Sequence, residues 1–243
     1  MFTDVSVTMT SCDVPRHTDG MATPITRLLL VRHGEHDPRG RFLQHACDGL
    51  TASGRAQARR LGHRLAQGHE WNVAAVLASK AARSIETARI LGEALGIGLA
   101  SQSCDLCEMH PGDAEGLTTD EIAKRWGSLS YSAIPGAESY EEWLPRFADG
   151  LDSIVERHRG DTIVCVTHSA AVKACFELLG RMPRPEATST AVVGNTAVTE
   201  WVVGEVGPWG TGTDATWSLV RHNETAHLLR TLPVSAAGNE VAP

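Results

Sequence analysis

The sequence lacks an excess of positive charge and lacks any long apolar run. Its 243 residues carry 22 Lys and Arg against 29 Asp and Glu, a formal net charge of -7. Nucleic-acid binding needs a basic face that releases counterions, so this charge argues against a nucleic-acid partner. A membrane-spanning helix needs roughly 20 consecutive apolar residues, and no run approaches that length. We therefore expect no membrane segment and no polyanionic partner.

The sequence also lacks a cysteine pattern typical of secreted or zinc-binding domains. It has six cysteines in a long chain, and Cys165 and Cys175 lie inside apolar runs. This distribution favours reduced thiols in a cytoplasmic protein. Cys104 and Cys107 form a C-x-x-C pair, but no second pair completes a metal site, and we interpret the spacing as chance. The sequence predicts no metal and no cofactor.

No signal peptide is recognisable at the N-terminus, because no basic start is followed by an apolar core. We expect residues 1–24 to be a disordered tail, with Met21 as an alternative functional start. Residues 25–232 are expected to form one domain, since α/β domains commonly reach this size undivided and no linker is visible. Residues 233–243 are expected to be a C-terminal tail.

Apolar runs of strand length alternate with helical patterns along the first half of the chain. The run 28–31 ends in Arg32-His33-Gly34, and the run 73–78 ends in Ser79. A first helix is expected to begin after Thr51 as N-cap and to stop at Gly68. A second helix, with Arg83 in its first turn, is expected to end at Gly96.

The second half repeats this design around a histidine. A loop over 101–116 precedes a helical cap that we expect to contain helices over 119–126 and 139–158. The apolar run 162–166 is followed by Thr167-His168-Ser169 and a helix over 170–179. The segments 195–203 and 216–221 alternate in period two and predict a closing strand pair.

Strands that alternate with helices indicate a mostly parallel sheet. We predict an α/β three-layer sandwich with a mostly parallel central sheet and helices on both faces. A small cap of helices and loops is expected over the carboxyl ends of the strands, where open α/β sheets bind their ligands.

Five polar residues are expected to meet at that edge of the sheet: Arg32, His33, Arg83, Glu108 and His168. Taken singly, a strand-end Arg-His-Gly is more often a solvated charge beside a hydrogen-bonded histidine, and Glu108 is one acid in a loop. Together they suit a phosphoryl group, whose oxygens guanidinium and imidazolium donors can hold. A metal-free histidine can accept the phosphoryl group, and a carboxyl can protonate the departing alkoxide and then activate water. We expect Arg32, Arg83 and a protonated His168 to supply the pocket's positive charge.

The sequence closely resembles the histidine phosphatase superfamily, also called the phosphoglycerate mutase-like family. The resemblance runs from about Arg27 to about Leu229, and its motifs are Leu30-Val31-Arg32-His33-Gly34-Glu35, Leu50-Thr51-Ala52-Ser53-Gly54 with Gln57-Ala58, Ser79 to Ala88, Leu106-Cys107-Glu108 with Glu115-Gly116, Gly136 to Ser139, Val166-Thr167-His168 and Asn195 to Thr199. The resemblance implies that His33 is the phosphorylated nucleophile and Glu108 the proton donor. It further implies that Arg32, Arg83 and His168 complete the phosphate pocket.

Three departures from the family pattern concern substrate binding. Arg39 replaces an Asn common in the family, and it either meets a second acidic group of the substrate or is a solvated loop arginine. Ser169 replaces the usual Gly after the second histidine. Met109 and His110 replace the Arg and Tyr of the family's mutases, which favours hydrolysis over mutase activity. We take Arg39, His110 and Ser169 as candidate substrate-binding residues.

The function predicted from the sequence is a phosphomonoesterase that hydrolyses a small phosphorylated metabolite through a phosphohistidine intermediate. Two alternatives stay open: a mutase or phosphotransferase of the same fold, and a non-catalytic phospho-ligand binder or regulator. The expected partner is a small phosphomonoester. The sequence leaves the oligomeric state open, a homodimer included. It does not identify the substrate, because the residues that would select it lie in the variable segment 109–143.

Overall fold

The computed structural model describes residues 24–37, 41, 47–68, 70–184, 191–204 and 217–229. Residues 1–23 of the expected tail over 1–24, the expected tail over 233–243, the alternative start Met21 and the candidate residue Arg39 lie outside this part of the chain. None of the helices in the described ranges is both long and apolar enough to span a bilayer.

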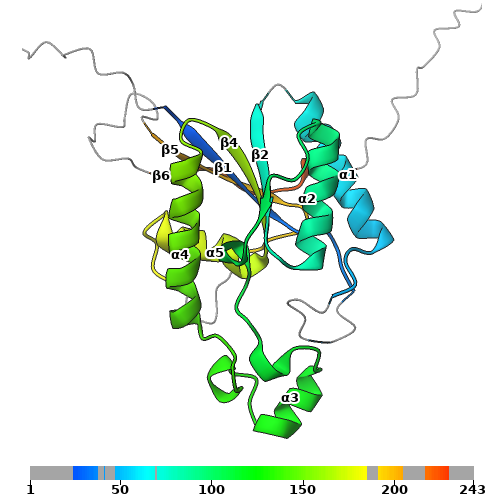
Figure 1. Ribbon diagram of the computed structural model, residues 1–243, viewed down its shortest axis with the longest axis vertical. Coiled ribbons are helices and arrows are strands. Elements are labelled where there is room, and N and C mark those ends of the chain that lie inside the picture. The colour runs from blue at the N-terminus through cyan, green and yellow to red at the C-terminus, as the bar shows by residue number, and fades with distance from the viewer. Residues whose placement is uncertain are drawn as a thin grey trace, which may run out of the picture.

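One six-stranded sheet forms the centre of the molecule (Figure 1). In spatial order its strands are β3 (Ser101–Gln102), β2 (Val73–Ala78), β4 (Thr162–Thr167), β1 (Thr26–Arg32), β5 (Val198–Val203) and β6 (Trp217–Glu224). The first four strands in this order are mutually parallel, whereas β5 and β6 are antiparallel to their neighbours. The predicted mostly parallel sheet and its closing strand pair are therefore confirmed.

Two pairs of helices cover the two faces of the sheet (Figure 1). On one face α1 (Ala52–Gln67) and α2 (Ala82–Leu95) pack on Leu29 and Val31. On the other face α4 (Tyr140–Arg157) and α5 (Ser169–Leu178) pack on Leu28 and Leu30. Successive residues of a strand point to opposite faces. The apolar run of β1 therefore serves both cores, as expected of a central strand of a three-layer sandwich.

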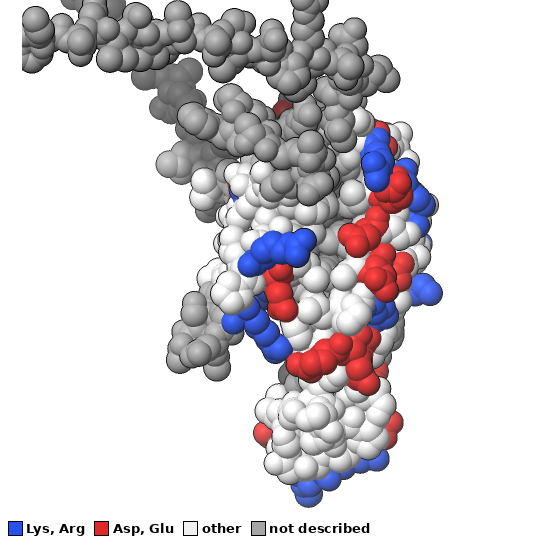
Figure 2. All heavy atoms as spheres, turned by 90° about the vertical axis from the view of Figure 1, so that its left-hand side faces the viewer, with Lys and Arg blue, Asp and Glu red and all other residues white. Residues whose placement is uncertain are grey.

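The cap is smaller than the sequence indicated. It contains α3 (Thr119–Trp126) and has its own small core of Ala114, Ile122 and Ile134. Figures 1 and 2 show it as a separate lobe below the sheet. We had expected α4 in the cap, but its residues Trp143 and Phe147 are fully buried in the core beneath the sheet. Its large apolar stripe requires a wide apolar face, which the sheet offers and the cap does not. The opposite side of the helix carries a column of acidic side chains (Figure 2).

Two other expectations are corrected. The segment 195–203 was expected to alternate, yet the strand begins at Val198 and is buried almost throughout, because β5 lies between β1 and β6. Cys104 and Cys107 form a disulfide, contrary to the expectation of reduced thiols with chance spacing. A single 3₁₀ turn over Cys104–Leu106 brings their Cα atoms to 4.6 Å. The thiols of Cys47, Cys165 and Cys175 are free and buried.

Candidate active site

The candidate site forms where three parallel strands end. His33 directly follows β1, His168 directly follows β4, and Ser79 directly follows β2. The register pairs Arg32 with Thr167, so the two histidines leave the sheet side by side. Their ring centroids are 5.2 Å apart, and both side chains are buried. The sheet edge expected from the sequence is thus the place where the polar residues meet.

The hydrogen bonds of His33 determine its tautomer. Its Nδ1 lies 2.8 Å from the carbonyl oxygen of Gly34, which can only accept, so Nδ1 carries the hydrogen. Its Nε2 accepts a hydrogen bond from Arg83 Nε at 3.1 Å. Burial, reinforced by the charge of Arg83, places the pKa of His33 well below its ordinary value. The ring is therefore neutral, with its Nε2 lone pair directed at Arg83.

Arg83 connects the two histidines. It lies in the first turn of α2 and is almost completely buried. Besides its bond to His33, it donates from Nη2 to Nδ1 of His168 at 3.1 Å. Its Nη1 donates to the sulfur of Cys47 at 3.5 Å. One guanidinium thus fixes the orientation of both rings.

His168 is neutral in the free site, which corrects the expectation that it is protonated. Its Nδ1 accepts from Arg83, so the ring hydrogen is on Nε2, which donates to Ser79 Oγ at 2.9 Å. Burial lowers the pKa of His168 well below its ordinary value, and the neighbouring charge of Arg83 adds to the effect. A histidine with no solvent contact beside a buried cation does not retain a second proton.

Arg32 points an incompletely bonded guanidinium into this region. Its Nη1 donates to the carbonyl oxygen of Val193 at 2.7 Å. Its Nε is buried and has no hydrogen-bond partner among the described residues. Burial lowers the pKa of Arg32, the charge of Glu108 opposes this shift, and Arg83 adds to it. A buried donor without an acceptor is costly unless a ligand supplies one.

Glu108 lies beside the N-terminus of α5. Its Oε1 accepts from the backbone N–H of Ala170 at 2.8 Å. Thr167 Oγ1 donates to the Leu106 carbonyl at 2.7 Å, and Trp143 Nε1 donates to the Cys107 carbonyl at 2.9 Å. The residues just before Glu108 are thus anchored to the sheet and to α4, which holds the carboxylate at the edge where the strands end.

The family motifs around His33 brace the turn that carries it. A Cβ on Gly34 would lie 2.7 Å from the Gly54 carbonyl oxygen, and a Cβ on Gly54 would lie 2.1 Å from the Glu35 carbonyl oxygen. Both positions therefore require glycine for close backbone contact. Gln57 accepts from the backbone N–H of Glu35 at 2.9 Å, and Thr87 accepts from that of Gly34 at 3.0 Å. These residues position the nucleophile candidate without entering the site.

The three candidate substrate-binding residues do not all lie with the five central residues. Ser169 is the first residue of α5 and directly follows His168. The Nε2 of His110 lies 3.7 Å from Cys104 Sγ, and its backbone N–H donates to Glu138, so its ring lies on the disulfide side of the loop. Arg39 is outside the described residues.

Sequence reasoning missed three residues of the site. Ser79 and Cys47 contact His168 and Arg83, and the ring of His36 lies 5.0 Å from that of His33. Burial lowers the pKa of His36 to about 4, with Arg83 and Arg32 as further causes. Only Ser79 carried a usable signal, because it directly follows an apolar strand as His33 and His168 do.

The buried neutral histidines predict a loss of stability in acid. His33 and His168 stay unprotonated in the fold, whereas histidines of the unfolded chain take up protons below about pH 6.5. The unfolded state then binds more protons, so the free energy of unfolding should fall as the pH falls below that value. Each buried imidazole contributes about 1.4 kcal/mol per pH unit, roughly 3 kcal/mol for the two together. Urea unfolding at about pH 7.5, 6.5 and 5.5 measures this slope.

Two variants provide the comparison. His168→Gln should reduce the slope, and exposed His63→Gln should leave it unchanged. Stability that does not change between neutral and acidic pH would contradict the assignment of neutral buried rings.

Comparison with known proteins identifies the family. The family model of the histidine phosphatase superfamily (branch 1) matches residues 28–212. The chain belongs to this superfamily. The match begins within β1 and continues past β5, and it includes all five residues that the structure gathers at the sheet edge.

Relatives within the histidine phosphatase superfamily include both mutase-like and phosphatase proteins. The chain is 29% identical over 214 residues to phosphoglycerate mutase-like protein 4 of Arabidopsis thaliana, covering 84% of this chain and 89% of the relative. It is 30% identical over 163 residues to a metal-independent phosphoserine phosphatase of the same plant, covering 63% and 68%. The solved structure of Bacillus stearothermophilus YhfR is 29% identical, with a TM-score of 0.67 and coverage of 84% and 100%.

Proposed function

We propose that this chain is a phosphomonoesterase that hydrolyses a small phosphorylated metabolite through a phosphohistidine formed on His33. Its membership of the histidine phosphatase superfamily and its similarity to a phosphoserine phosphatase support a phosphatase. In this proposal Arg32, Arg83 and His168 bind the phosphoryl group, and Glu108 is the general acid and base. Ser169 and Arg39 remain candidate contacts to the substrate.

The observation that carries the proposal is the state of His33. A nucleophilic imidazole must be neutral, and the attacking nitrogen must be the one without hydrogen. The Gly34 carbonyl holds the hydrogen on Nδ1, and burial and Arg83 keep the pKa of the ring low. The lone pair on Nε2 accepts a hydrogen bond from Arg83 Nε at 3.1 Å. A phosphoryl group bound by the Arg83 guanidinium would therefore lie next to Nε2 of His33.

The surroundings suit a phosphoryl group in transfer. The charge of the phosphoryl oxygens would be met by the guanidinium groups of Arg32 and Arg83, including the unpartnered Nε of Arg32. Arg83 would exchange its bond to Nε2 for a bond to a phosphoryl oxygen as the nitrogen–phosphorus bond forms. A bound dianion would also favour protonation of His168, because a nearby opposite charge raises the pKa of an imidazole.

The chemical steps follow from these positions. Nε2 of His33 attacks phosphorus, the bond from phosphorus to the ester oxygen breaks, and protonated Glu108 gives its proton to that oxygen. Water then attacks the phosphohistidine, Glu108 takes up a proton of that water, and the phosphorus–nitrogen bond breaks. Inorganic phosphate leaves, and His33 is restored. In this proposal Glu108 performs both proton transfers, first as general acid and then as general base.

Trapping the phosphoenzyme tests the proposal. The protein is mixed with p-nitrophenyl phosphate, quenched in alkali, in which phosphohistidine survives, and digested for mass spectrometry. The phosphoryl group should be found on the peptide that contains His33, together with steady release of inorganic phosphate. A protein that releases phosphate with no phosphohistidine would refute the covalent route.

Phosphotransfer is the alternative, and similarity to a phosphoglycerate mutase-like protein favours considering it. Against it, Met109 and His110 stand where the mutases of the family carry Arg and Tyr, and the ring of His110 lies beside Cys104. Turnover in the presence of 3-phosphoglycerate and excess glycerol distinguishes the two: a hydrolase yields inorganic phosphate, whereas a transferase yields isomerised or new esters.

Turnover is expected to survive chelation. The proposed mechanism draws its positive charge from two guanidinium groups, and no group of three or more His, Cys, Asp or Glu in the described ranges is placed to hold a metal. Phosphate release after dialysis against EDTA should match that of the untreated protein. Activity that is lost in EDTA and restored by Mg²⁺ or Zn²⁺ would contradict this expectation.

A further inference from the structure

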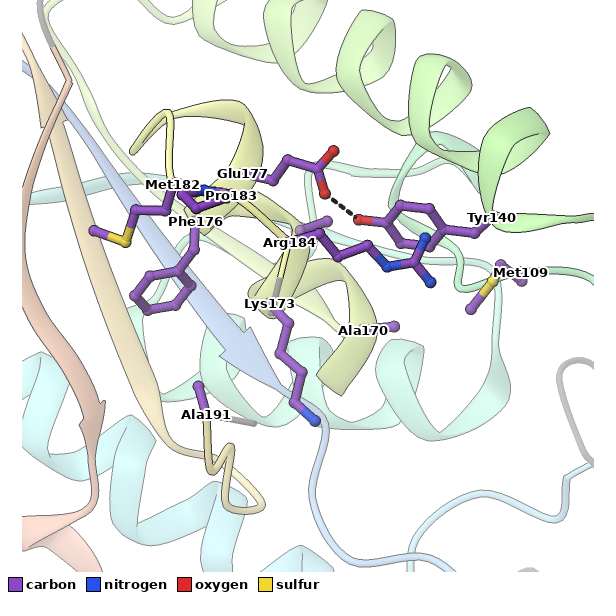
Figure 3. A pocket seen from close by; sticks show the side chains of 11 residues that line it. Met109, Tyr140, Ala170, Lys173, Phe176, Glu177, Met182, Pro183, Arg184 and Ala191 are labelled. Atoms are coloured by element: carbon purple, nitrogen blue, oxygen red, sulfur yellow. Dashed lines mark hydrogen bonds between the residues drawn. The ribbon is translucent and has the colours of Figure 1, made fainter. Parts of the chain in front are cut away.

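A cavity of about 590 Å³ lies between the start of α4, one side of α5 and the chain around Met182 (Figure 3). Most residues that line it are apolar, with Met109 at one end and Phe176 and Met182 at the other. The volume is within the range of about 300–1,000 Å³ typical of pockets for organic ligands. It exceeds what a three-carbon acid such as serine or glycerate would fill.

The cavity adjoins the candidate active site at two points. Met109 follows Glu108 directly, and Ala170, which also lines the cavity, donates its backbone N–H to Glu108 at 2.8 Å. At the second point, Arg32 donates to the carbonyl of Val193, two residues beyond the lining residue Ala191. The ester oxygen of a substrate must lie beside the general acid. The group attached to that oxygen would therefore extend from Glu108 into this cavity.

The charges along the cavity wall are mostly engaged with one another. Tyr140 donates its hydroxyl to Glu177 at 2.9 Å, and the guanidinium carbon of Arg184 lies 3.8 Å from the centroid of the Tyr140 ring. Lys173, one helical turn beyond Ala170, extends away from this group (Figure 3). Its ammonium makes no ion pair or hydrogen bond within the part of the chain that the structure describes. One cation is thus available to a ligand in this mainly apolar space.

We propose that this cavity binds the leaving group of the substrate. The substrate is then the phosphomonoester of an extended, mainly apolar alcohol that carries one acidic group for Lys173. The proposal rests on the phosphatase function proposed above and specifies its substrate class.

Three esters of primary alcohols test the proposal: ethyl phosphate, hexyl phosphate and 6-phosphonooxyhexanoate. Their leaving groups differ little in basicity, so differences in kcat/KM report binding of the chain. Each buried methylene is worth up to about fourfold. The kcat/KM for hexyl phosphate should therefore be roughly tenfold or more above that for ethyl phosphate. The terminal carboxylate of 6-phosphonooxyhexanoate should raise kcat/KM by a further factor of about two to five, which is the contribution of an exposed ion pair.

Two variants locate these effects. Lys173→Met keeps the apolar stem and should remove the advantage of 6-phosphonooxyhexanoate over hexyl phosphate. Lys124→Met, on the exposed side of α3, is the matched control and should leave that advantage intact. Met182 is 45% exposed, so Met182→Trp can fill the cavity without disturbing the core, and it should lower the ratio of hexyl to ethyl phosphate.

A binding measurement separates failure of this proposal from failure of the phosphatase function. Hexylphosphonate and methylphosphonate resist hydrolysis, and calorimetry gives their affinities without turnover. Tighter binding of hexylphosphonate, weakened by Met182→Trp, with no ester hydrolysed, would refute the phosphatase function and keep the cavity as a binding site. Hydrolysis of ethyl and hexyl phosphate with equal kcat/KM, unaffected by Met182→Trp, would refute the cavity proposal and uphold the phosphatase.

Discussion

Replacing His33 by alanine is expected to abolish turnover and to leave the fold intact. The variant removes the only nitrogen lone pair proposed to attack phosphorus, and loss of a nucleophile costs roughly 10³-fold or more in kcat. The backbone N–H of His33 still donates to the Thr167 carbonyl, so the join between β1 and β4 is retained. No phosphoenzyme should be detected. Phosphate release and mass spectrometry of the quenched protein provide the measurement.

The controls for this variant address both folding and assignment. Far-UV circular dichroism and the urea midpoint should remain near those of the parent protein. His63→Ala, an exposed histidine of α1, should retain full turnover. Phosphoryl label that persists in His33→Ala would reassign the nucleophile, and His168 would be the first residue to test.

Glu108→Gln is expected to slow hydrolysis of alkyl phosphates by about 10²–10⁴-fold, the usual contribution of general acid catalysis. The amide oxygen can still accept the hydrogen bond from Ala170, so the variant removes the proton and retains the geometry. The loss should depend on the leaving group. Ethoxide is strongly basic and requires the proton, whereas p-nitrophenolate leaves almost unaided.

Rapid-quench kinetics with ethyl phosphate and p-nitrophenyl phosphate measures this difference. Phosphorylation of His33 by the nitrophenyl ester should survive better in the variant than phosphorylation by the ethyl ester. Because the same carboxylate is proposed to activate water, the variant should accumulate phosphohistidine. With p-nitrophenyl phosphate, Glu108→Gln should release a burst of nitrophenolate and then turn over slowly.

The same loop offers a matched control. Glu115→Gln removes a neighbouring carboxylate from the segment that leads into the cap and should leave the phosphorylation rate with both esters equal to that of the parent. An equal loss of phosphorylation rate for both esters in Glu108→Gln would remove Glu108 from the acid role. Glu115, Asp113 and His110 would then be the residues to examine.

Much of the architecture could be predicted from local patterns. The N-caps and stops expected at Thr51, Gly68 and Gly96 are where α1 and α2 begin or end, because capping depends on a few neighbouring residues. The convergence of Arg32, His33, Arg83 and His168 was also predictable. Parallel strands bring their carboxyl ends to one edge, so residues that follow β1 and β4 meet there whatever lies between them in sequence.

Long-range packing could not be predicted in the same way. The apolar stripe of α4 indicated that one face of this helix is buried, but it did not indicate whether that face packs on the cap or on the sheet. Nothing in the sequence indicated that the cavity beside Glu108 would form between α4, α5 and the segment around Met182. Such features depend on which helices, strands and loops pack together when they are far apart in the sequence.

The sequence by itself indicated the five central residues of the candidate site, and the tertiary structure added Ser79, Cys47 and His36 and decided the chemical state of the histidines. His168 was expected to carry a proton, yet burial beside Arg83 leaves it neutral and donating to Ser79. The lone pair of His33 is assigned to Nε2 by the carbonyl of Gly34. Residue identity fixes which groups can ionise. Their pKa values and tautomers depend on burial, on charges a few ångströms away and on hydrogen-bond partners, and these exist only once the chain has folded.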